Sequence, residues 1–236
     1  MNRKFKRVLI KLSGEAMVGS QGYGIDPEVL SYTASEVASV CATGVETGIV
    51  IGGGNIFRGL SKNAESMNRV QADQMGMLAT MINSIALHNA LKNAGIDSVI
   101  QSAISIDKIA DQVIISKALD HFKNGKVVIF ACGTGNPFFT TDTAAVLRAK
   151  EIGADIMIKA TKVDGIYDSD PVTNAGAKKI RSLSHMEVMK QNLRVLDITA
   201  VSFSLENSLR IGVVNLLKKG HLKGFLNGED VGSVIE

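Results

Sequence analysis

The 236-residue sequence contains no tryptophan, only three prolines and only two cysteines. Cys41 lies on a predicted helix and Cys132 on a predicted strand, both apolar, which indicates buried, reduced thiols rather than a metal site. The four histidines are scattered and form no ligand pattern: His88, His121, His185 and His221. A chain of this length buries roughly 70–75% of its unfolded surface, so it needs no disulfide or metal to fold.

Long apolar runs are also missing. No stretch approaches the ~18 residues that a membrane span needs. The basic residues 2–7 resemble the start of a signal peptide, but only Val8–Ile10 follow before Lys11. That run is too short for the apolar part of a signal. We therefore expect a soluble, cytoplasmic protein with no membrane partner.

Neither sign of charge is in large excess. The net charge is +3, and the lysines and arginines are dispersed along the chain. This distribution favours an ordinary solvated surface over a nucleic-acid-binding face. Because the basic residues are dispersed, we expect no nucleic-acid partner. A small anionic substrate would also fit the net positive charge.

Three common catalytic or nucleotide-binding motifs are absent. The sequence has no Gly-x-x-x-x-Gly-Lys-[Ser/Thr] cradle for phosphates. It has no Gly-x-Gly-x-x-Gly followed by a ribose-binding acid ~20 residues later. It also lacks the Gly-x-Ser-x-Gly elbow of many hydrolases. Any phosphate site must therefore be built in another way.

What the sequence has is a regular alternation of apolar strands and helices. Six strands are predicted: Val8–Leu12, Thr47–Ile51, Asp97–Ile100, Lys126–Ala131, Asp155–Lys159 and Ile211–Leu216. The predicted helices are Pro27 to Gly44 with Asp26 as N-cap, about Ala64 to Asn93, Asp107 to Phe122, a helix after Asp142, and fragments flanking 197–199. Residues 161–179 read as loop. Uninterrupted apolar strands separated by helices predict an α/β fold, one domain over residues 1–236, with a mainly parallel sheet covered on both faces.

The second of these helices is apolar around most of its circumference. A surface helix normally shows only one apolar stripe. We therefore expect this helix to be buried against neighbouring elements or against a partner subunit.

Two glycine-containing loops follow the first two strands. Lys11–Glu15 places a lysine at a strand tip, where its ammonium needs a partner such as a phosphate, although a lysine snorkelling at the sheet edge is the alternative. Residues 52–59 contain three successive glycines and Arg58. They allow close approach to a ligand and a guanidinium fork onto phosphate, and the alternative is a tight turn with a solvent-facing arginine.

The most informative loop is Gly133–Asp142. It follows a buried strand, is rich in hydroxyls and small residues, and leads into a helix, which suits an anion that carries a ribose or base. Asn136 has the groups to read a base edge, whereas Phe138 and Phe139 pack either on a flat ring or in the core. Asp142 is placed to cap the helix and to orient Lys11.

The fourth loop spans residues 160–171. Val163 and Tyr167 have the shape to sandwich a purine, and Asp170 has the acceptors for ribose hydroxyls. The same loop is also ordinary turn chemistry, because Asp-Gly and Asp-Pro pairs are common in turns.

Five motifs in this order resemble those of the bacterial uridylate kinases, a branch of the amino-acid kinase superfamily. They are Lys11–Ala16, Gly52–Gly59, Asp73–Thr80, Gly133–Asp142 and Lys159–Gly165. The first and last are shared across the superfamily, whereas Gly133–Asp142 and Met75–Thr80 are specific to the uridylate branch. The resemblance covers essentially the whole chain.

The resemblance implies a three-layer αβα sandwich, possible acceptor-binding N-terminal and ATP-binding C-terminal lobes, and transfer of a phosphoryl group from ATP, with Mg²⁺, to UMP. It implies a homo-oligomer, a hexamer in the family, activated by GTP and inhibited by UTP. The implied catalytic residues are Lys11, Arg58 and Asp142. The implied ATP site comprises Lys11, Leu12, Ser13, Gly14, Gly54, Arg58, Thr161, Tyr167 and Asp170. The implied UMP site comprises Gly53, Asp73, Thr134, Gly135, Asn136, Pro137, Phe138, Phe139, Thr140 and Thr141. The implied GTP-responsive segment comprises Gly19, Ser20, Gln21, Gly22, Tyr23 and Gly24. No metal ligand is implied, because Mg²⁺ is held mainly by nucleotide phosphates.

Two other functions remain open from the sequence. One is a kinase of the same superfamily that acts on an amino acid or an isoprenoid phosphate. The other is a non-catalytic assembly that binds nucleotides or stores anions on the same fold. Loss of Lys11 or Arg58 would favour the second function, and both residues are present.

Overall fold

The computed structural model describes residues 5–19, 22–57, 67–169, 173–174, 176–193 and 195–236. Its centre is a nine-stranded sheet with the strand order β4-β3-β5-β2-β1-β6-β10-β11-β9. The strands are β1 Arg7–Leu12, β2 Glu46–Ile51, β3 Ser98–Ser102, β4 Asp111–Gln112, β5 Val127–Ala131, β6 Ile156–Thr161, β9 Ser182–Leu183, β10 Ile211–Asn215 and β11 Gly232–Ile235. A two-stranded sheet pairs β7 Ile166–Tyr167 with β8 Lys179–Ile180. All neighbours in the large sheet are parallel except β10 and β11.

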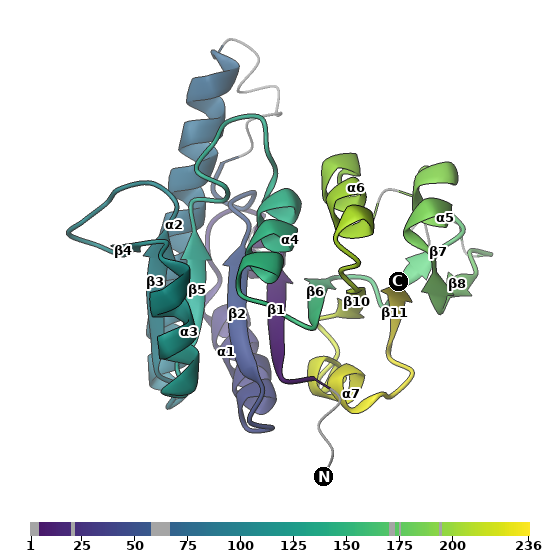
Figure 1. The fold of residues 1–236 in the computed structure, drawn as a ribbon, viewed down its shortest axis with the longest axis horizontal. Helices are drawn as coiled ribbons and strands as arrows, with labels where there is room; N and C mark the ends of the chain where they lie inside the picture. The colour runs from purple at the N-terminus through teal and green to yellow at the C-terminus, as the bar shows by residue number, and fades with distance from the viewer. Residues whose placement is uncertain (1–4, 20–21, 58–66, 170–172, 175, 194) are drawn as a thin grey trace.

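Helices cover both faces of this sheet (Figure 1). They are the 3₁₀ helix η1 Gly14–Met17, followed by α1 Pro27–Cys41, α2 Arg69–Asn93, α3 Ile115–Lys123, α4 Thr141–Glu151, α5 His185–Lys190, α6 Ile198–Glu206 and α7 His221–Asn227. Side chains of α1, α2 and α7 share one core cluster, and those of α3 to α6 share the other. The predicted three-layer αβα sandwich is confirmed.

The two core clusters follow from the period-two alternation of the strands. In β1, Val8, Ile10 and Leu12 join the cluster under α1, α2 and α7, whereas Leu9 joins the cluster under α3 to α6. These four side chains are fully buried. Burial of each aliphatic side chain contributes roughly 1.5–3 kcal/mol. An uninterrupted apolar strand therefore stabilises both layers at once.

All six predicted strands are present, and α1 begins as expected. Asp26 is its N-cap and accepts hydrogen bonds from the backbone N–H groups of Glu28 and Val29. The long second helix starts at Arg69 and is capped by Asn68. Residues 64–66 of that prediction lie outside the described residues.

Other predicted boundaries were wrong. The helix expected from Asp107 begins only at Ile115, because Asp111–Gln112 pairs with Gln101–Ser102 as the edge strand β4. Within the loop expected between residues 161 and 179, Ile166–Tyr167 starts a short hairpin with Lys179–Ile180. Cys132 lies one residue beyond β5 at φ 62°, not on the strand, and is buried as a free thiol.

Across the described part of the chain, no helix combines the length and apolar character that crossing a membrane requires.

Candidate active site

The carboxyl ends of the central parallel strands lie at one edge of the sheet, at the top of Figure 1. Two cavities open there. The larger has a volume of about 540 Å³ and is lined mainly by the loop after β6 and the segment after α5. The smaller has a volume of about 250 Å³ and is lined by the loops after β2 and β5 and by the first turns of α2. Open parallel sheets bind ligands at this edge.

A compact ionic cluster connects the two cavities. Lys11 on β1 and Lys159 on β6 are register partners on neighbouring strands. Lys11 Nζ lies 2.8 Å from Asp142 Oδ1, and Lys159 Nζ lies 2.7 Å from Asp142 Oδ2. Lys159 lines the larger cavity, and Thr141, which precedes Asp142, lines the smaller one. Lys11 and Asp142 themselves line neither cavity, so the cluster, with its net positive charge, adjoins the larger cavity through Lys159 and the smaller one through Thr141.

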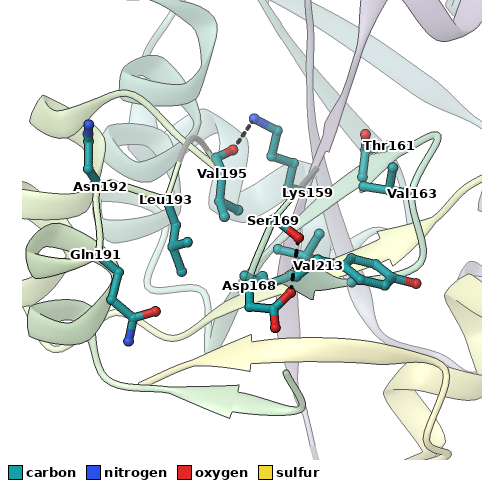
Figure 2. A pocket seen from close by; sticks show the side chains of 13 residues that line it. Lys159, Thr161, Val163, Asp168, Ser169, Gln191, Asn192, Leu193, Val195 and Val213 are labelled. Atoms are coloured by element: carbon teal, nitrogen blue, oxygen red, sulfur yellow. Dashed lines mark hydrogen bonds between the residues drawn. The ribbon is translucent and has the colours of Figure 1, made fainter. Parts of the chain in front are cut away.

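Burial and mutual attraction act in opposite directions on the charges of this cluster. Burial by itself raises the pKa of Asp142, but the charges of Lys11 and Lys159 outweigh it and leave the pKa below its ordinary value. Burial lowers the pKa of Lys159, and Asp142 only partly restores it. Asp142 is therefore held ionised. Figure 2 shows that Lys159 also donates to the backbone oxygen of Val195.

Sequence reasoning gave no role to Lys159. The signal was available, since a lysine in a strand buried on both faces needs a partner wherever it occurs. The argument that singled out Lys11 on β1 applies equally to Lys159 on β6.

The glycines after β1 and β2 lie against protein atoms. A Cβ on Gly14 would stand 2.6 Å from the backbone oxygen of Gly52, and a Cβ on Gly53 would stand 2.8 Å from Cβ of Ala79. Packing alone therefore requires glycine at these two positions. Gly53 and Gly54 also line the smaller cavity, together with Phe57.

Other residues implied for the ATP site lie at the tip of β1 or outside the described residues. Leu12 is fully buried in the core, so its side chain faces away from solvent. Ser13 holds the N-cap position of η1 without a side-chain capping bond. Arg58 and Asp170 lie outside the described residues.

A buried amide pair fixes the loop after β2, whose described residues 52–57 are here called the glycine loop. Asn55 and Asn83 exchange side-chain hydrogen bonds of 3.0 and 2.7 Å, and Asn83 also donates to the backbone oxygen of Gly52 at 2.6 Å. Asn55 further donates to the backbone oxygen of Gly24 at 2.8 Å. Sequence reasoning did not identify this pair, which ties the loop after β2 to α2 and to the segment that ends at Gly24.

The loop after β5 is shaped by positive backbone angles at Gly133, Gly135 and Phe138. Thr134, Asn136, Phe139, Thr140 and Thr141 line the smaller cavity, opposite Asp73 of α2. The remaining members of the implied site, Gly135, Pro137 and Phe138, do not line it. Phe138 instead donates its backbone N–H to Asp73 Oδ2 at 2.7 Å.

Asp142 is not the cap of α4. Thr140 is the N-cap, and its side-chain oxygen accepts from the backbone N–H groups of Asp142 and Thr143. Thr140 is better placed because a hydroxyl before the helix reaches the free N–H groups of the first turn. Asp197, which sequence reasoning missed, accepts from the hydroxyls of Thr140 and Thr143 and caps α6.

The larger cavity has both polar and apolar lining residues, and Figure 2 shows Thr161, Asp168 and Gln191 among the polar ones. Val163 and Tyr167 also line it. Tyr167 Oη donates to Asp164 at 2.6 Å, and Lys218 Nζ lies 2.9 Å from the same carboxylate. These two partners lower the pKa of Asp164 to about 2. The ring of Tyr167 is thereby held at the edge of the cavity.

In the segment implied for GTP, Gly19, Gly22 and Gly24 have positive φ angles, and Tyr23 is exposed. Ser20 and Gln21 lie outside the described residues. Gly24 donates to the backbone oxygen of Asn55 at 3.0 Å, so the segment ends against the glycine loop.

Comparisons with known proteins agree with this arrangement. The model of the amino acid kinase family matches residues 6–215. The chain belongs to this family. It is 54% identical over 231 residues to a uridylate kinase of Magnetococcus marinus, with 98% of the chain and 96% of that relative covered.

Solved structures give the same result. UMP kinase from Bacillus anthracis aligns with a TM-score of 0.95 at 38% identity, over 99% of this chain and 97% of that one. UMP kinase from Ureaplasma parvum aligns with a TM-score of 0.92 at 33% identity, over the full length of both chains. The predicted resemblance to the bacterial uridylate kinases is confirmed.

Proposed function

We propose that this member of the amino acid kinase family transfers the γ-phosphoryl group of ATP to UMP and releases ADP and UDP. The observation that carries this proposal is the Lys11–Asp142–Lys159 cluster, which stands between two cavities at one sheet edge. The names of its relatives support UMP as the acceptor. The reaction is a step of pyrimidine nucleotide biosynthesis, and we place it in the cytoplasm.

The main obstacle to this reaction is repulsion between two polyanions. Each pair of unit charges 4 Å apart costs ~4 kcal/mol at an effective dielectric constant of ~20. The acceptor is already a phosphate oxyanion, so no general base is needed. Catalysis must therefore come from positioning and from fixed positive charge around the transferred group.

The cluster has the geometry for this task. Two ammonium groups from neighbouring strands meet one carboxylate, so the carboxylate fixes both positions before any substrate arrives. Asp142 neutralises one of the two charges, which leaves about one positive charge for the transferred phosphoryl group. We assign Lys11 and Lys159 to that group, Asp142 to holding them, and Arg58 to further phosphate oxygens.

The larger cavity is assigned to ATP. It extends from Lys159 to a rim that contains Tyr167. The assigned residues are Lys11, Lys159, the backbone of residues 12–14, Gly54, Arg58, Thr161, Tyr167 and Asp170. Both oxygens of Asp142 face ammonium groups, so this carboxylate is not free to take a divalent cation. Among the described residues, no three histidine, cysteine, aspartate or glutamate side chains gather into a metal site. We propose that Mg²⁺ binds as part of the MgATP substrate, held mainly by the nucleotide phosphates.

The smaller cavity is assigned to UMP. This cavity, of about 250 Å³, lies between Asp73 and the hydroxyl-rich loop after β5. The assigned residues are Gly53, Asp73 and residues 134–141. In this assignment Asp73 accepts from the ribose, and the loop threonines bind the base and phosphate.

A homo-oligomer, a hexamer by family expectation, is part of the proposal. Met75, Leu78, Ile82 and Ile85 are all at least 40% exposed on α2. Their spacing of three, four and three residues puts them in one stripe, as in paired helices. Activation by GTP through residues 19–24 and inhibition by UTP also remain proposals. The two hydrogen bonds between Gly24 and Asn55, one donated by each residue, support a connection from this segment to the glycine loop.

A coupled assay of ADP release tests the proposed function directly. With MgATP present, we expect turnover with UMP well above that with CMP, AMP, isopentenyl phosphate or amino acids. Preference for an amino acid or an isoprenoid phosphate would identify another kinase of the family. Tight binding of nucleotides without any ADP release would identify the non-catalytic alternative.

A further inference from the structure

Arg69, the first residue of α2, makes contacts that the proposed reaction does not use. Its Nε donates to both carboxylate oxygens of Asp73, each at 2.9 Å. Its guanidinium carbon stands 5.4 Å from the centre of the Phe138 ring. Asp73 in turn accepts from the backbone N–H of Phe138. One arginine therefore contacts both a residue of the smaller cavity and the loop that covers it.

This arrangement is more than a surface ion pair along one helix. An exposed i,i+4 pair contributes little to stability and fixes nothing beyond its own helix. Here the carboxylate is mostly buried, with 16% of its side chain exposed, and it is shared with a loop 65 residues later in the chain. Phe138 has a φ angle of 72°, which a bulky residue adopts only when its surroundings hold it there.

We propose that Arg69 is a positioning residue for the acceptor nucleotide: it aims Asp73 at the ribose and holds the loop of residues 134–140 against α2. This inference rests on the proposed function, since it assigns the same cavity to UMP. Arg69 itself does not line the cavity. It acts through Asp73 and Phe138.

The hydrogen-bonding capacity of Asp73 sharpens the inference. An ionised carboxylate has about four acceptor sites, two on each oxygen. Arg69 takes one on each oxygen, and Phe138 takes a second on Oδ2. With only the contacts of the described residues counted, one site on Oδ1 remains for a ligand. Asp73 therefore has room for one ribose hydroxyl, and the other hydroxyl goes unread by this carboxylate.

Titration calorimetry on the full chain tests the role of Arg69. The ligands are UMP, 2′-deoxy-UMP, 3′-deoxy-UMP and a non-hydrolysable ATP analogue. For wild type, we expect one of the two deoxy analogues to bind much more weakly than UMP, which identifies the hydroxyl that Asp73 reads. For Arg69→Gln, we expect UMP binding to weaken roughly tenfold, the size of one lost charge-assisted hydrogen bond. The deoxy analogue lacking that hydroxyl should lose much less.

Three comparisons separate positioning from a general structural effect. ATP-analogue affinity and kcat at saturating UMP should stay within twofold in Arg69→Gln. Arg69→Lys should fall between wild type and Arg69→Gln, because it keeps the charge without the planar fork. The control is Lys123→Gln, which removes an exposed i,i+3 ion pair on α3, away from both cavities. It should bind every ligand as wild type does.

The outcomes are distinguishable. Wild-type affinity for UMP in Arg69→Gln, or an equal loss for UMP, both deoxy analogues and the ATP analogue, overturns the inference and leaves the proposed function standing. Failure of the wild-type chain to bind UMP overturns both. Arg69 is 42% exposed at a helix start, and melting curves check that its variants fold. If Arg69→Gln is unfolded, Arg69→Lys decides by the same comparison.

Discussion

Lys11 and Lys159 lie side by side on two neighbouring parallel strands, and the single carboxylate of Asp142 binds both of their ammonium groups. The separation of the lysines is set by the sheet and not by flexible loops. Strand spacing of ~4.8 Å suits two cations that contact different oxygens of one phosphoryl group. The sheet therefore supplies the rigidity that electrostatic catalysis requires.

Replacing Lys11 tests the cluster most simply. Lys11→Ala should lower turnover by on the order of 10²–10³-fold, comparable to the loss of one oriented donor at a transition state. The coupled ADP-release assay measures this effect. The control is Lys123→Ala, which removes an exposed lysine and should leave turnover unchanged. Near-normal turnover of Lys11→Ala would remove Lys11 from the mechanism.

Asp142 also has a structural role that can be measured separately. Asp142→Asn keeps the shape of the side chain but leaves the buried ammonium of Lys11 and the half-buried ammonium of Lys159 without this counter-charge. We expect the free energy of unfolding to fall by roughly 3 kcal/mol in urea titrations. Asp120→Asn, which breaks the exposed pair with Lys123, should change it by less than about 0.5 kcal/mol. Equal effects of the two substitutions would show that the buried cluster does not stabilise the fold.

The pKa of Lys159 should determine how the activity falls at alkaline pH. Burial lowers the pKa of Lys159 below its ordinary 10.5, so its charge is lost at a pH below 10.5. The kcat/KM for ATP, which reports the free enzyme, should fall along a limb with its midpoint in that range. Lys159→Arg should move the limb to higher pH, because a guanidinium stays charged.

The stability of the protein changes in the opposite direction over the same range. The unfolded chain there holds more protons on Lys159 than the folded chain, so the contribution of Lys159 to the free energy of unfolding rises with pH. Titration of Lys159 therefore does not unfold the protein as activity falls.

An alkaline limb of kcat/KM for ATP that is unchanged in Lys159→Arg would exclude Lys159 from the active site.

The sequence predicted the core of the fold because its central strands are buried on both faces. Apolar runs such as Val8–Ile10 and Val127–Phe130, separated by helical segments, are typical of a parallel sheet covered on both faces. Short edge elements carry no such signal. Asp111–Gln112 reads as helix from its neighbours and becomes a strand only because β3 offers an open edge.

The site was partly predictable for a related reason. Lys11 stood out as a charge in a buried strand followed by a glycine loop, and the hydroxyl-rich loop after β5 stood out by composition. Arg69 and Asn83 did not, because each lies in a helix where its residue type is ordinary. Their contacts, with Asp73 and Phe138 or with Asn55, depend on how α2 packs across the strand tips.

The exposed stripe on α2 predicts the assembly. Leu78 and Ile82 are each 49% exposed, one turn apart. If the proposed oligomer forms through this stripe, Leu78→Lys combined with Ile82→Lys should give smaller species in sedimentation, because charge in an apolar interface lacks solvation. Lys123→Gln should leave the mass of the wild type unchanged. An unchanged mass of the double variant would contradict a subunit interface at this stripe.

We propose that fixed positive groups at neighbouring strand tips hold two mutually repelling nucleotides in line. A crystal structure with UMP and a non-hydrolysable ATP analogue would show whether they do. We expect UMP in the cavity beside Asp73, the adenosine beside Tyr167, and the γ-phosphate within hydrogen-bond distance of the ammonium groups of Lys11 and Lys159. Nucleotides bound away from this sheet edge, or a γ-phosphate remote from both lysines, would contradict it.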